Sequence, residues 1–127
     1  MSIEKIDILD IATEAMKRRI DVLNILKTYE DKGLGIEGWF KCELLYEFDK
    51  RGIPVMVQNK GPDLNFGHME IELKGAVGKV SKWIAREGLK YGIPVLYLGR
   101  TESIKDLNPE YRVINEDWVV GLIEPPK

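Results

Sequence analysis

The chain has 127 residues, 44% of them hydrophobic and 31% charged, which is the composition of a soluble globular protein. This length predicts one domain with a buried core, and no apolar run approaches the roughly 18 residues that a membrane span requires. A formal net charge of -2 and an isoelectric point near 5.5 do not indicate a nucleic-acid binder, so phosphate contacts would need a local basic patch.

Single copies of cysteine and histidine narrow the possible chemistry. Cys42 is the only cysteine, which excludes an internal disulfide and a cysteine-based zinc site. His68 is the only histidine, and we expect it to be a turn residue. Acid–base or metal chemistry must therefore fall mainly to carboxylates and lysines. The cysteine usage favours a reducing, cytoplasmic compartment. The N-terminus lacks a basic flank before an apolar stretch, so we do not expect it to be a secretory signal.

The N-terminal segment is predicted to be helical. Apolar residues recur at steps of three and four from residue 3 to about residue 31, which indicates one or two amphipathic helices. Lys17-Arg18-Arg19 is the most basic stretch of this segment, and we expect it on a solvated helix face. Gly33 and Gly35 bracket a break in the pattern.

A second helical segment is expected from about Glu37 to Arg51, with Gly52 just after its end. The middle of this helix is apolar around most of its circumference, so it should be buried on more than one side. Glu43 lies inside the apolar belt, where a carboxylate without a partner is unfavourable.

Three strands are predicted next. Ile53–Gln58 reads as a strand with Pro54 at its start, and Lys60-Gly61 turns the chain. Pro62–Asn65 reads as a short strand, and Met69–Lys74 as a clearly alternating one.

The second half of the chain is predicted to alternate helix and strand. Residues 76–91 are expected to form a helix, and residues 93–98 form a continuous apolar run typical of a central buried strand. Residues 112–114 and 118–123 supply one or two further short elements. The apolar side of the predicted helix carries Val77, Val80, Trp83, Ile84 and Tyr91.

This order of elements implies an α/β domain with a mixed sheet flanked by helices, because a hairpin meander is followed by a helical crossover. We expect a single domain over residues 1–127. It would comprise an N-terminal helical extension (1–34), a core (35–99) and C-terminal elements (100–127).

The alternation in Met69–Lys74 places Glu70, Glu72 and Lys74 on one face of the strand. If the preceding turn uses Gly67-His68, Asp63 lies directly opposite Glu72. If it uses Phe66-Gly67, Asp63 faces Glu70 and still shares a face with Glu72. Either register gathers carboxylates and a lysine on one patch.

Such a patch suits phosphodiester cleavage. Mg²⁺ typically binds one or two carboxylates together with water and substrate phosphate, and the bound ion activates water and stabilises charge on the phosphate. Lys74, two residues beyond Glu72, reaches the same face and could offset negative charge. Two adjacent acids repel one another, and a divalent ion relieves that repulsion.

Pro62-Asp63, followed by Glu72-Leu73-Lys74 on the next strand, resembles the PD-(D/E)XK nuclease superfamily, which includes many restriction enzymes and archaeal junction resolvases. The resemblance extends over residues 37 to about 99. It implies a restriction-endonuclease-like fold with the core order αβββαβ, Mg²⁺ or Mn²⁺ as cofactor, and DNA hydrolysis. In that family the two acids bind magnesium and the lysine serves catalysis, which implies that Asp63 and Glu72 are metal ligands and Lys74 is catalytic. An acid on the first helix of the family often completes the site. By position this is Glu43, with Glu37 and Glu47 as alternatives.

A basic stripe is predicted on the helix over residues 76–91. Lys79, Lys82, Arg86 and Lys90 follow one another at steps of three, four and four, so they would share one helix face. This stripe is either a track for the DNA backbone or an ordinary solvated face.

We expect a metal-dependent endonuclease that acts on DNA as a homodimer, since a small acidic chain offers little surface for reading bases. One alternative is a non-catalytic nucleic-acid-binding or assembly module of the same fold. Another is a small α/β interaction protein whose charged strand is only a solvated sheet face.

Overall fold

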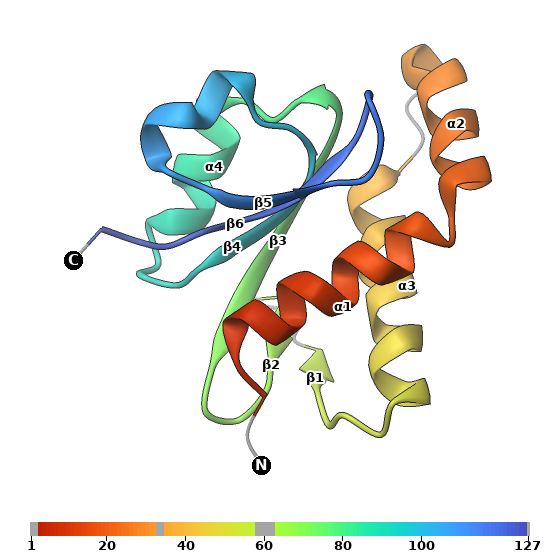
Figure 1. The fold of residues 1–127 in the computed structure, drawn as a ribbon. Helices are drawn as coiled ribbons and strands as arrows, with labels where there is room; N and C mark the ends of the chain where they lie inside the picture. The colour runs from red at the N-terminus through yellow and green to blue at the C-terminus, as the bar shows by residue number, and fades with distance from the viewer. Residues whose placement is uncertain (1–2, 33–34, 58–62, 127) are drawn as a thin grey trace.

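The computed structural model describes residues 3–32, 35–57 and 63–126, apart from the side chains of Asp31 and Ile84. The predicted turn at Lys60-Gly61 and Pro62 of the motif lie outside the described residues. Figure 1 shows the arrangement of the elements. In chain order they are α1 (Lys5–Lys17), α2 (Ile20–Thr28), η1 (Glu30–Lys32), α3 (Ile36–Lys50), β1 (Met56–Val57), β2 (Leu64–Asn65), β3 (Glu70–Lys79), α4 (Lys82–Leu89), β4 (Val95–Arg100), η2 (Glu102–Leu107), β5 (Glu110–Val113) and β6 (Val119–Ile123).

The strands form one six-stranded mixed sheet in the order β1-β2-β3-β4-β6-β5. β1, β2 and β3 are antiparallel neighbours, β3 and β4 run parallel with α4 between them in the chain, and the β4–β6 and β6–β5 pairs are antiparallel. This confirms the prediction of a mixed sheet flanked by helices. Of residues 93–98, predicted as a central strand, residues 95–98 belong to β4, and β4 lies between β3 and β6.

The hairpin between β2 and β3 has the first of the two predicted registers. Leu64 pairs with Ile71 and Asn65 with Glu70, so the turn is centred on Gly67-His68. Gly67 has φ 92°, and its N–H donates to the Asn65 side chain at 2.7 Å. Continued by one position, this register places Asp63 opposite Glu72.

The predicted helix over residues 76–91 is wrong at its start. Residues 76–79 continue β3, and Lys79 pairs with Arg100 after an irregularity in the ladder. Gly75 and Gly78 weaken any helix there, and Gly78 has φ 93°. The helix begins at Lys82, so the four basic residues predicted to share one helix do not: Lys79 lies on β3.

The phase of α4 also differs from the prediction. Trp83 and Tyr91, expected on the apolar side, are 70% and 59% exposed. Ala85 and Leu89 face the interior instead.

The first predicted strand is shorter than expected too, since only Met56 and Val57 pair with β2 among the described residues.

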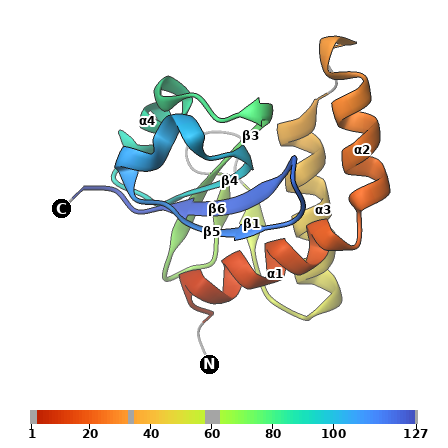
Figure 2. The same cartoon turned by 45° about the horizontal axis from the view of Figure 1, so that its top comes forward.

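Two hydrophobic clusters lie on opposite faces of the sheet, and Figure 2 shows α1 on one side and α4 on the other. α1 belongs to the main cluster and contacts α3, β5 and β6, so the predicted N-terminal extension is part of the packed structure. β4 divides its side chains between the clusters, with Leu96 and Leu98 on the α1–α3 side and Val95 and Tyr97 on the α4 side. No described helix has the length and apolarity needed to cross a bilayer.

Candidate active site

Asp63 and Glu72 form the centre of the candidate site. Asp63 directly precedes β2, and Glu72 lies on β3, where strand pairing brings the two positions opposite each other. Their carboxyl groups are hydrogen-bonded to each other. Asp63 also accepts hydrogen bonds from the backbone N–H of Leu73 at 2.9 Å and from Lys41 Nζ at 3.1 Å. Asp63 is therefore held by groups from both β3 and α3.

The two carboxyl groups have opposite pKa shifts. Burial, followed by the hydrogen bond and the negative charge of Asp63, raises the pKa of Glu72 to about 8, although Lys74 opposes this shift. Burial also acts to raise the pKa of Asp63, but the hydrogen bonds from Glu72, Leu73 and Lys41 outweigh it and hold that pKa below its ordinary value. At neutral pH the pair therefore carries about one proton, as expected for two acids in close contact.

Glu37 and Lys74 complete the cluster. Burial raises the pKa of Glu37; the charge of Asp63 adds to this shift, while the charge of Lys74 and a hydrogen bond from the Gly75 backbone oppose it. The start of α3 approaches β3 closely at Gly75, where a Cβ atom would lie 3.4 Å from Glu37 Cα. The glycine therefore allows Glu37 to reach the carboxylate pair.

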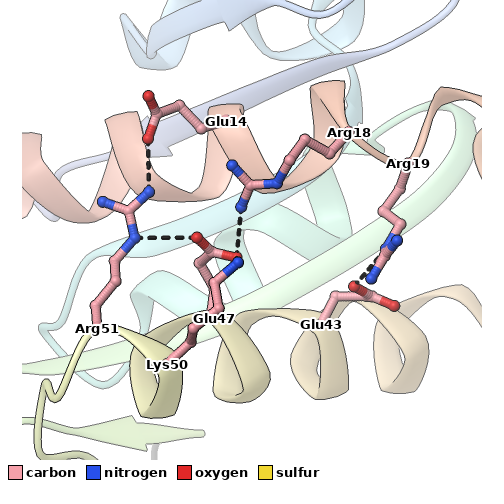
Figure 3. Close-up of polar contacts among 7 residues, drawn as sticks. All are labelled: Glu14, Arg18, Arg19, Glu43, Glu47, Lys50 and Arg51. Atoms are coloured by element: carbon pink, nitrogen blue, oxygen red, sulfur yellow. Dashed lines mark hydrogen bonds and ion pairs between the residues drawn. The ribbon is translucent and has the colours of Figure 1, made fainter.

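Glu43 and Glu47 lie elsewhere, which corrects the choice of Glu43 as the completing acid. Glu43 accepts a hydrogen bond from Arg19 Nε at 3.0 Å. Glu47 is buried and bonded to Arg18 and Arg51, and Figure 3 shows both acids pointing toward α1 and the residues that follow it. Glu43 follows Glu37 by six residues, which places the two side chains about 120° apart around a helix.

α4 covers one side of the carboxylate cluster through Gly88. A Cβ atom at this position would lie 3.3 Å from Glu72 Cγ and 3.7 Å from Lys74 Cε. It would also lie 2.5 Å from Val95 Cγ2, so only a glycine fits without displacement. The close approach connects the position of α4 to that of Glu72 and Lys74.

The basic residues of the predicted stripe have acidic neighbours. Lys82 Nζ lies 2.7 Å from Asp106 Oδ2, and Lys90 Nζ lies 2.7 Å from Glu87 Oε2. Arg86 is exposed and has no ion pair within the described part of the chain. The positive charge of the predicted stripe is therefore partly neutralised, and Lys79 lies on β3 and not on the helix.

The donor set suits a hard divalent cation. Across residues 3–32, 35–57 and 63–126, no three His, Cys, Asp or Glu side chains are arranged as a metal-binding group. Asp63 and Glu72 nevertheless supply a pair of carboxylates, and Mg²⁺ commonly takes one or two, with water and substrate phosphate as the other ligands. His68 bonds the Ile3 carbonyl at 2.7 Å, in keeping with a structural turn residue.

Sequence reasoning missed Lys41 and ranked Glu37 too low. The spacing of four between Glu37 and Lys41 places them on one helix face, and this spacing could have indicated that they lie together.

Comparisons of the chain with protein-family models, curated proteins and solved structures gave no significant match. The chemistry of the carboxylate cluster is therefore the basis for a functional proposal.

Proposed function

We propose that this protein is a Mg²⁺- or Mn²⁺-dependent nuclease that hydrolyses DNA phosphodiester bonds. The observation that carries this proposal is the hydrogen-bonded pair of Asp63 and Glu72, with Lys74 beside it and the pKa of Glu72 raised to about 8. Two carboxylates so close to each other repel unless a proton or a cation lies between them. A divalent ion would relieve this repulsion more completely than one proton.

The order of elements from α3 to β4 supports a restriction-endonuclease-like fold. This part of the chain runs helix, three strands, helix, strand, and the crossover through α4 leads to a parallel strand. The same order is implied by the resemblance to the PD-(D/E)XK superfamily. Fold similarity alone does not establish an activity, so the proposal depends on the side chains of the cluster.

The side chains can be given separate roles. Asp63 and Glu72 would bind the ion, which supplies an activated water and stabilises charge on the phosphate. Lys74 shares the strand face of Glu72 and can neutralise a phosphate oxygen or orient the attacking water. Glu37 interacts electrostatically with Lys74 and would help to position it.

A cleavage assay tests this function. Purified protein is incubated with duplex, single-stranded, branched and RNA substrates in Mg²⁺, Mn²⁺ or EDTA. We expect divalent-dependent cleavage of at least one DNA substrate, and loss of cleavage in Asp63→Asn and Lys74→Met. Glu70→Gln is the matched control, because Glu70 lies on the same strand face two residues before Glu72. If wild-type protein cuts nothing, the nuclease proposal fails.

The second candidate is a non-catalytic nucleic-acid-binding or assembly module of the same fold. The ion pair of Lys41 with Asp63 favours it, because an ammonium group can neutralise the carboxylate where a metal ion would otherwise bind. Calorimetric titration with Mn²⁺ distinguishes the candidates. A nuclease binds the ion through Asp63, whereas the module binds DNA without it.

A further inference from the structure

The outer face of α4 combines two exposed aromatic rings with two cations. Trp83 is 70% and Tyr91 59% exposed, and Arg86 and Lys90 are also exposed. Trp83, Arg86 and Lys90 are spaced by three and four residues, so they lie on one side of the helix and its end, and Tyr91 is the next residue in the turn after it. We refer to Trp83, Arg86, Lys90 and Tyr91 as the α4 face.

The aromatic residues of the α4 face do not contribute to either hydrophobic cluster. The interior contacts of α4 come from Ala85 and Leu89, on the opposite side of the helix. An exposed Trp forgoes a large gain from burial, and aromatic residues in such positions are typical of binding surfaces. The two aromatic rings are therefore not needed for the packing of the fold and are accessible to a ligand.

The charge around the α4 face is opposite to that of the whole chain. Residues 79–91 contain four cations and one acid, a net charge of +3, whereas the complete chain carries -2. Lys82 and Lys90 have ion pairs with Asp106 and Glu87, and Arg86 has none among the described residues. Lys90 Nζ lies 5.3 Å from the centroid of the Tyr91 ring, so a cation and an aromatic ring are presented together. Two cations between two aromatic rings match a ligand that has flat apolar groups and regularly spaced negative charges.

The helix that carries the α4 face packs on the candidate active site through its inner side. Gly88 of the same helix packs against Glu72 and Lys74. A Cβ atom at Gly88 would lie 3.3 Å from Glu72 Cγ and 3.7 Å from Lys74 Cε. Tyr91 follows Gly88 by three residues and lies in the turn just beyond the end of α4. Within the helix, the six residues that follow Trp83 already rise roughly 9 Å, which exceeds the ~3.4 Å between stacked bases. The two rings can therefore contact different bases.

We propose that the α4 face binds a single-stranded segment of DNA on the outer side of the helix that covers the carboxylate cluster. Trp83 and Tyr91 stack on unpaired bases, while Arg86 and Lys90 contact the phosphates on either side. This inference rests on the proposed nuclease function and specifies its substrate class: DNA with unpaired bases, such as a single strand, an overhang or a branch. A continuous duplex is a poorer ligand, because its base faces are covered by stacking.

Binding measurements in EDTA test this inference without any cleavage. The probes are a fluorescently labelled oligodeoxythymidine and a duplex of equal length, titrated with wild type, Trp83→Ala and Tyr91→Ala. We expect each substitution to raise the Kd for the single strand roughly 5- to 150-fold, the usual effect of losing one base–aromatic stack. The Kd for the duplex should change by less than about twofold, since phosphate contacts dominate there.

Two further variants make the comparison specific. Trp83→Phe keeps an aromatic ring and should retain most of the affinity for the single strand. Tyr46→Ala is the matched control, because Tyr46 is 57% exposed on α3 and has Lys50 Nζ 5.5 Å from its ring centroid. It should bind both probes like wild type.

Several results would overturn the inference. These are no binding of the single strand by wild type, equal losses on single strand and duplex, or a loss in Tyr46→Ala as large as in Trp83→Ala. A dimer that becomes monomeric in Trp83→Ala, with unchanged DNA affinity, would instead assign the α4 face to self-association. If wild type binds as expected but cuts nothing, this inference stands and the nuclease proposal alone fails.

Discussion

Lys41 Nζ lies 3.1 Å from Oδ1 of Asp63, and the pair is largely shielded, with side-chain exposures of 23% and 21%. The other oxygen of Asp63 accepts the backbone N–H of Leu73. Both oxygens of the proposed metal ligand therefore already have donors within the protein. A divalent ion bound at this position would compete with the Lys41 ammonium group for Oδ1.

Replacing Lys41 with glutamine should tighten metal binding. Lys41→Gln removes the competing cation, and we expect an increase in Mn²⁺ affinity of about two- to fivefold, the scale of a partly exposed ion pair. Isothermal titration calorimetry measures it, with Lys50→Gln as a control for lost charge on the same helix. Weaker binding in Lys41→Gln would show that Lys41 orients Asp63 instead of competing.

The raised pKa of Glu72 predicts a pH dependence of stability in EDTA. Glu72 holds its proton up to about pH 8 when folded, whereas its ordinary pKa is 4.5. Between these values the folded state binds more protons than the unfolded state, so the free energy of unfolding falls as pH rises through about 8. We expect the Tm of wild type to fall by roughly 3 °C or more over this range relative to Glu72→Gln. Parallel curves for the two proteins would contradict this.

The placement of Glu37 predicts which acid of α3 matters for activity. Glu37→Gln should lower the single-turnover cleavage rate about 10- to 100-fold, as for other residues that orient metal-site groups. Glu43→Gln should cleave like wild type, because Glu43 bonds Arg19 and not the cluster. Equal losses of cleavage rate in the two variants would mean that α3 is placed differently in the active protein than in this structure.

The contrast between Glu37 and Glu43 shows why part of the site could be predicted and part could not. Asp63, Glu72 and Lys74 follow from the two-residue period of a strand and a short turn, both of which are local. The choice among three acids on α3 depends on which face of the helix meets β3. An apolar belt around most of the helix gave no indication of that phase.

The end of β3 could not be predicted for a similar reason. Val77, Val80 and Ile84 follow a helical spacing, and so do the lysines among them. Pairing of Lys79 with Arg100, distant in sequence, holds this segment in the sheet. A contact over such a separation is not visible in local periodicity, and it decides the structure here.

Glu47 should be important for stability rather than for activity. The hydrogen bond from Arg18 is the largest cause that lowers the pKa of Glu47, and the hydrogen bond from Arg51 adds to it. Burial opposes both, and the resulting pKa is about 2. Glu47→Gln leaves these cations without their buried partner, and we expect a loss of about 1–3 kcal/mol in the free energy of unfolding by urea. Glu43→Gln should cost less. Since the pKa is lowered, the contribution of Glu47 is present above its ordinary pKa of 4.5 and is lost as pH falls through about 2.

Two glycine-to-alanine substitutions in helices should have opposite effects on stability. Gly38 lies within α3, and no neighbouring atom of the described residues lies within 4 Å of the position that an alanine methyl group would take. Gly38→Ala should therefore stabilise the protein by about 0.5–1 kcal/mol through helix propensity. At Gly88 the methyl group would lie 2.5 Å from Val95 Cγ2 and 3.3 Å from Glu72 Cγ. Gly88→Ala should lose stability by about 1–3 kcal/mol, because overpacking outweighs propensity.

Gly88→Ala should also affect the candidate site, which separates it from a general loss of stability. To admit the methyl group, α4 must move away from Glu72 and Lys74, so the affinity for Mn²⁺ should change at temperatures where the protein is still folded. Circular dichroism and calorimetric titration on the same samples measure both effects, with Gly38→Ala as the control. Normal metal affinity in a destabilised Gly88→Ala protein would show that α4 does not position the carboxylate pair.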